Sequence, residues 1–76
     1  MEKKTIWLVE DGIATMPCAT KSGATDYFIW RMKDYEECGA SVNDMETLAD
    51  GGISALVVPK VGKAFVASCY PTTLHE

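Results

Sequence analysis

Asp11-Gly12 lies between two apolar runs and is the feature of this sequence that most narrows the possible folds. Residues 5 to 10, TIWLVE, are rich in the β-branched and aromatic side chains that strands favour. Both central positions of a type I′ turn require positive φ, which Asp-Gly tolerates, so the dipeptide predicts a tight β-hairpin. The returning strand is expected over residues 13 to 18, with Pro17 marking an edge strand or the strand's end.

A second hairpin is predicted near the carboxyl end of the sequence. Residues 53 to 58, ISALVV, form an apolar run typical of a buried strand. The segment 59 to 62, PKVG, has the composition of a turn, and residues 63 to 70 are expected to return as the partner strand. Residues 71 to 76, PTTLHE, show no regular pattern, so we expect a flexible tail there.

Residues 27 to 33, YFIWRMK, fit either a strand or a helix. In a strand, Phe28, Trp30 and Met32 would face the core, and the aromatic content favours this structure. In a helix, Phe28, Met32 and Tyr35 would share one face. The acidic residues that follow would then lie at the negative end of the helix dipole, which is unfavourable. We therefore prefer the strand.

A short helix is predicted between residues 41 and 52. Ser41 and Asp44 have the spacing of a capping box, in which side chains bond the free amides of a helix's first turn. The apolar residues that would share one face of this helix are Val42, Met45, Leu48 and Ala49. The glycine pair at 51 to 52 is expected to end it. Earlier in the chain, residues 20 to 25, TKSGAT, have the composition of a loop.

Together these elements predict one α+β domain over residues 1 to 76. We expect an antiparallel sheet of four to five strands with one or two short helices packed on one face. Seventy-six residues leave no room for a second domain. A composition of 47% hydrophobic and 24% charged residues favours a packed core over disorder.

The cysteines and the histidine lack the spacing of a metal or catalytic site. Cys18, Cys38 and Cys69 are separated by 20 and 31 residues, whereas zinc sites in short chains usually contain close cysteine pairs. His75, the only histidine, falls in the predicted tail, which is a poor position for a general base. We predict no metal, no cofactor and no enzymatic activity. The alternative is a small thiol enzyme or metal-binding protein that uses these four residues.

The sequence also bears on the cellular compartment. No apolar run approaches the roughly 18 residues needed to cross a bilayer. Only four apolar residues follow the amino-terminal lysines before Glu10, which is too few for a secretory signal. An odd number of cysteines without an export signal suits reduced thiols, so we expect a cytoplasmic protein.

An acidic stretch in the middle of the chain sets its net charge. Residues 33 to 50 read KDYEECGASVNDMETLAD. No Lys or Arg falls among the six carboxylates of this stretch, which are Asp34, Glu36, Glu37, Asp44, Glu46 and Asp50. Outside residues 34 to 50 the chain has seven basic and five acidic residues, so these six carboxylates account for the negative sign of the net charge, which is −4 at pH 7. Because like charges repel, we expect no direct binding to nucleic acid or to a membrane.

The acidic stretch is also the predicted partner-binding surface. A field of one sign steers a protein toward a basic groove on its partner. Tyr35 lies within the stretch and could supply an apolar anchor, as tyrosines often do at interface centres. The predicted site residues are Asp34, Tyr35, Glu36, Glu37, Asp44, Glu46 and Asp50. The alternative interpretation is that these acids only keep the protein soluble.

In its length, its acidity and its lack of a catalytic motif, the chain resembles the small acidic proteins that bacteriophages encode to disable host nucleic-acid machinery, anti-CRISPR proteins among them. The resemblance rests on these overall properties and on no residue string. It implies a non-enzymatic inhibitor that blocks a basic site on a larger, nucleic-acid-handling protein. In such an inhibitor the carboxylates stand in for phosphates.

A second hypothesis is a structural or oligomeric subunit, a homodimer included, that associates through a sheet edge or an apolar face. Trp7, Trp30 and Phe65 are the candidate contact residues. Salt dependence separates the two hypotheses, because binding between charged surfaces weakens steeply with ionic strength and apolar association does not.

Overall fold

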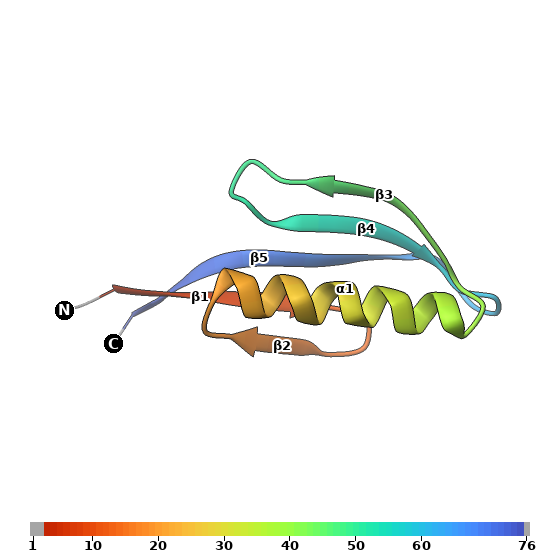
Figure 1. The fold of residues 1–76 in the computed structure, drawn as a ribbon, viewed down its shortest axis with the longest axis horizontal. Helices are drawn as coiled ribbons and strands as arrows, with labels where there is room; N and C mark the ends of the chain where they lie inside the picture. The colour runs from red at the N-terminus through yellow and green to blue at the C-terminus, as the bar shows by residue number, and fades with distance from the viewer. Residues whose placement is uncertain (1–2, 76) are drawn as a thin grey trace.

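The structure is a computed structural model that describes the backbone of residues 3–75 and the side chains of residues 4–73. The elements in chain order are β1 (Lys3–Glu10), β2 (Thr15–Cys18), α1 (Lys21–Glu37), β3 (Ser41–Thr47), β4 (Ile53–Val58) and β5 (Phe65–His75). All strands pair antiparallel in one sheet of order β2-β1-β5-β4-β3, and α1 packs on one face of that sheet (Figure 1). The predicted α+β class is confirmed, with five strands and one helix.

The first hairpin forms as predicted, but its turn is longer than a type I′ turn. Glu10 pairs with Thr15, so four residues connect β1 to β2. Gly12 has a φ of 93°, whereas Asp11 has no positive φ, so the tight two-residue turn is wrong. The Asp11 carboxylate instead accepts hydrogen bonds from two backbone amides of the loop and holds the longer turn. Pro17 lies on β2, an edge strand, as predicted.

The segment from residue 21 to residue 37 is a single helix, so the preferred strand over 27–33 and the loop over 20–25 are both wrong. Thr20 is the N-cap, and its hydroxyl oxygen accepts a hydrogen bond from the Gly23 amide at 3.0 Å. The residues that have loop composition are therefore the cap and first turn of α1. The seven-residue window from 27 to 33 is too short to reveal this, because the helical period of the apolar residues appears only over the full length of the element.

The buried face of α1 consists of Ala24, Phe28 and Met32, spaced four residues apart. At the carboxyl end, the amides of Gly39 and Ala40 donate to carbonyls of the last turn, which satisfies groups that the helix itself leaves free. Gly39 has a φ of 95°, a conformation that glycine adopts without strain.

Residues 41–47 form strand β3, so the helix predicted between 41 and 52 is wrong. Asp44 and Met45 lie between the pairs Asn43↔Leu56 and Glu46↔Ser54, and together they oppose a single residue of β4. This arrangement is a β-bulge, and Asp44 adopts a φ of 52° within it. A helix of about ten residues is marginal by itself, whereas pairing with β4 satisfies the backbone of this segment.

The bulge predicts the response to substitution at Asp44. Glycine relieves the left-handed backbone, so Asp44→Gly is expected to raise the free energy of unfolding by about 0.5 kcal/mol, and Asp44→Val to lower it by about 1 kcal/mol or more. Asp44→Asn is the control, because asparagine tolerates this conformation while removing the charge, and it should unfold like the parent. Urea denaturation measures all three; equal losses for the glycine and valine variants would contradict the assigned backbone.

Strand β5 continues to His75, so the flexible tail predicted over 71–76 is wrong for residues 71–75. The returning strand predicted over 63–70 begins at Phe65. Lys3 to Glu10 pair with His75 to Ser68 along the whole length of β1. The tail becomes ordered because the amino-terminal strand supplies its hydrogen-bonding partners, a contact between distant segments that local composition does not reveal. Residue 76 lies outside the described part of the chain.

The two faces of the sheet differ in what covers them. Under α1 the sheet contributes the buried side chains of Val9, Ala55, Val57, Ala67 and Cys69. The opposite face, called the open face below, carries the alternate residues of the three central strands, which are Lys4, Ile6, Leu8, Glu10, Ser54, Leu56, Val58, Val66, Ser68, Tyr70 and Thr72 among the described side chains. Within residues 3–75 no second layer packs against the open face (Figure 1).

Candidate functional site

Five of the six predicted carboxylates follow one edge of the sheet. Glu36 and Glu37 end α1, Asp44 and Glu46 lie on the edge strand β3, and Asp50 lies in the turn between β3 and β4. We call these five residues the acidic edge. The end of α1 leads directly into β3, and β3 runs along the outer side of the sheet to the turn that contains Asp50 (Figure 1).

The side chains of all five residues of the acidic edge are exposed, although Asp50 Oδ1 accepts a hydrogen bond from the Gly52 amide at 2.8 Å. Among side chains 4–73, the ion pairs involve only Asp11, Arg31 and Asp34, so none of the five carboxylates has a cation within salt-bridge distance. The chain therefore presents these charges to solvent rather than neutralising them internally.

Asp34, the sixth predicted carboxylate, is paired within the chain, although its side chain is 46% exposed. Its Oδ2 accepts a hydrogen bond from Arg31 Nη1 at 2.9 Å, and Arg31 Nε donates to Asp11 Oδ2 at 2.9 Å. Arg31 thus links the helix to the loop between β1 and β2. The last turn of α1 contains no basic residue, so the unfavourable dipole that favoured a strand in the sequence remains, and the packing of the helix against the sheet outweighs it.

Tyr35 also has a role within the fold. Its hydroxyl donates to the Asp11 carbonyl oxygen at 2.7 Å, and its ring packs edge-on against Phe65 with centroids 5.5 Å apart. The Arg31 guanidinium lies 5.1 Å from the centre of the same ring. Tyr35 is half-buried, and its hydroxyl and ring both make contacts within the chain, so it is not available as an anchor for a partner.

Trp30 is the exposed aromatic residue of α1, whereas the strand predicted over residues 27–33 would have placed it in the core. Its side chain is 59% exposed, beside Tyr27 at a centroid distance of 5.8 Å. In the helical alternative Trp30 falls off the Phe28 and Met32 face, and this signal could have identified it. The other two apolar candidates, Trp7 and Phe65, pack against the core beneath the helix, so the three do not form one surface.

The cysteines do not form a reactive or metal-binding group in the described part of the chain. Cys69 is buried, and its pKa is raised by burial first and then by the nearby Cys18 and Asp50, which disfavours the thiolate. Cys18 is half-buried and Cys38 is exposed on the turn after α1. Residues 3–75 contain no cluster of three or more side chains suited to a metal ion, and the His75 side chain lies outside those described.

Two further findings bear on the kind of protein this is. Residues 3–75 contain one helix, α1, and this helix is too short and too polar to cross a bilayer. No protein-family model, curated protein or solved structure matches the chain closely enough to count as a relative, so its function is inferred from its own geometry.

Proposed function

We propose that this protein is a non-enzymatic binding protein whose acidic edge occupies a basic site on a larger, nucleic-acid-handling partner. Its carboxylates stand in for phosphates and compete with the partner's natural ligand. The observation that carries this proposal is the set of five exposed carboxylates on edge strand β3, at the end of the helix before it and in the turn after it, none of which has a cation within salt-bridge distance among side chains 4–73. Unpaired charges of one sign increase association rates with an oppositely charged surface.

The shape of the acidic edge favours a groove over a point contact. β3 contains seven residues, and at about 3.3 Å per residue it extends over ~20 Å. Glu36 and Glu37 precede it and Asp50 follows it, so the charges extend beyond both ends of the strand. A row of this length matches a basic channel that accommodates several phosphates of a nucleic-acid strand.

The β-bulge in β3 favours contact through side chains rather than strand addition. An edge strand can accept a further strand from another chain, and charged residues and bulges are the devices that prevent it. β3 has both, because Asp44 lies in the bulge and Glu46 follows it. The partner is therefore expected to meet carboxylates and not a row of free backbone groups.

The proposed compartment is the cytoplasm. Cys18, Cys38 and Cys69 are free thiols, and reduced cysteines persist in that compartment. Nucleic-acid-handling partners with basic channels are available there.

Neutralising part of the acidic edge tests the proposal. The triple variant Glu36→Gln, Glu37→Gln, Asp44→Asn is expected to lose about 100-fold in partner affinity, taking about 1 kcal/mol for each exposed charge pair. Its melting temperature should not fall, because none of the three carboxylates is paired within the described structure. The immobilised parent protein should retain a partner from a cell lysate. Salt at roughly 0.5 M should release that partner because it screens the attraction between exposed charges, and added nucleic acid should release it by competition.

The control is the double variant Ser22→Lys, Asp26→Lys, which changes net charge by the same amount on exposed residues in the amino-terminal half of α1. It should retain the partner. If the triple variant binds as the parent does, or if both variants lose binding equally, the acidic edge is not the recognition surface.

A further inference from the structure

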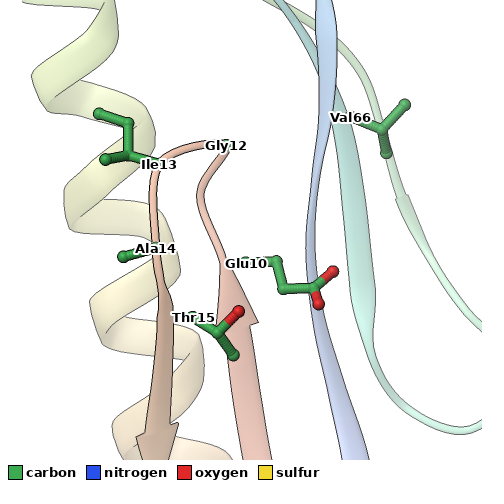
Figure 2. A pocket seen from close by; sticks show the side chains of 6 residues that line it. All are labelled: Glu10, Gly12, Ile13, Ala14, Thr15 and Val66. Atoms are coloured by element: carbon green, nitrogen blue, oxygen red, sulfur yellow. The ribbon is translucent and has the colours of Figure 1, made fainter.

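A hollow on the open face lies apart from the acidic edge. It has a volume of about 250 Å³ and is lined by Glu10, Gly12, Ile13, Ala14, Thr15 and Val66, where the loop between β1 and β2 meets β5 (Figure 2). This volume corresponds to roughly eight molecules of liquid water, enough for the end of one long side chain. It is smaller than the sites that hold drug-sized ligands.

Glu10 gives the hollow its charge. Its side chain extends from β1 toward β5 (Figure 2). The Tyr70 hydroxyl of β5 donates a hydrogen bond to Glu10 Oε1 at 2.9 Å. This hydrogen bond is the main reason that the pKa of Tyr70 is raised, so the tyrosine stays protonated and remains a donor. No cation pairs with Glu10 among side chains 4–73, and Oε2 accepts no hydrogen bond from them.

An exposed aliphatic side chain lies beside Glu10 in the same hollow. Val66 is 64% exposed, although it is large and apolar, whereas the Ile13 side chain points to the other side of the loop, toward α1 (Figure 2). A carboxylate beside aliphatic surface matches an arginine or lysine side chain, whose methylene stem packs on apolar surface while its charged head binds an anion.

The rest of the open face continues this pattern. Across the strands, Glu10, Ser68, Ser54 and Glu46 form one row, with Glu46 at its far end. Three strand spacings of about 4.8 Å separate the two carboxylates by ~14 Å. Leu8 and Tyr70 flank the row on one side, and Leu56 and Val66 flank it on the other. A partner segment that covers this face therefore needs apolar side chains between cationic ones.

From these contacts we propose that the hollow at Glu10 receives an arginine or lysine side chain of a partner protein, whose neighbouring apolar residues cover the open face. This second contact surface shares the basic partner of the proposed function but none of the three carboxylates tested there. Each surface can therefore fail without the other.

The test is an NMR titration of the full chain with a capped leucine-arginine-leucine tripeptide at millimolar concentration. The backbone amides of Thr15, Val66 and Ser68 are expected to shift. The same tripeptide with citrulline in place of arginine, which has the same shape without the charge, should leave them unchanged. Glu10→Gln should reduce the shifts at least fivefold while the spectrum stays folded, because glutamine still offers an oxygen to Tyr70.

Glu36→Gln is the matched control, since it removes one exposed carboxylate away from the hollow and should bind the tripeptide as the parent does. Equal shifts with the citrulline peptide, or full binding by Glu10→Gln, would overturn the proposal. Sedimentation that shows a dimer of this chain, converted to a monomer by Val66→Asp, would assign the open face to a second copy and would also overturn it.

Discussion

Asp11→Ala is expected to lower the free energy of unfolding by about 3 kcal/mol or more, a large share of the stability of a domain of this size. Asp11 is 5% exposed, and its carboxylate accepts from the amides of Ile13 and Ala14 and from Arg31 Nε. Alanine leaves two loop amides without their acceptor and a largely buried guanidinium with Asp34 alone. Urea denaturation followed by circular dichroism measures the loss.

The acid limb of the stability curve tests the same residue. Burial alone would raise the pKa of Asp11, but hydrogen bonds from Ala14 and Ile13 and the charge of Arg31 lower it below its ordinary value. The stability that comes from this shift is complete above the unfolded-state pKa of about 4 and is lost as the pH falls through the lower folded-state value. Asp11→Asn should flatten this limb, and an unchanged slope would show that the carboxylate is not bound as described.

Phe28→Ala is expected to destabilise the protein by about 3–5 kcal/mol, because it removes the largest fully buried side chain and leaves a cavity between helix and sheet. Small domains of this length have about 4–11 kcal/mol in total, so the variant should be partly unfolded at 37 °C. Thermal denaturation with calorimetry measures the loss.

Trp30→Ala is the matched control, two residues along the same helix. It removes a larger aromatic ring that is 59% exposed, so its cost should stay below about 1 kcal/mol. Equal losses in the two variants would mean that α1 presents a different face to the sheet.

Local patterns in the sequence predict the two hairpins and the α+β class, because a strand between turn residues is specified by its neighbours. The same patterns predict a strand within the segment that forms helix α1 and a helix in the segment that forms strand β3. The helix over 21–37 begins at Thr20, and the glycine in its first turn gives this region the composition of a loop. The segment 41–47 has the sequence pattern of a helix start because Ser41 and Asp44 have the spacing of a capping box. In the structure this segment is a strand because its backbone pairs with β4.

The acidic stretch is found from the sequence alone, since charge does not depend on the secondary structure. Which of its members reach solvent does depend on the fold. Asp34 and Tyr35 turn inward because Arg31, one helical turn earlier, joins them to Asp11, a residue more than twenty positions away. The hollow at Glu10 forms because β1 and the loop after it lie beside β5. No local sequence pattern predicts this contact between distant segments.

The pairing of β1 with β5 has a consequence for how the chain acquires its structure. Two of the three central strands, β1 and β5, are the first and the last strand in the chain, so their paired residues lie far apart in the sequence. Closing so long a loop costs entropy before any of the central hydrogen bonds can form. The pairing of β1 with β2, the pairing of β3 with β4 and the helix can therefore form early, whereas the pairing of β1 with β5 must wait until β5 has been synthesised.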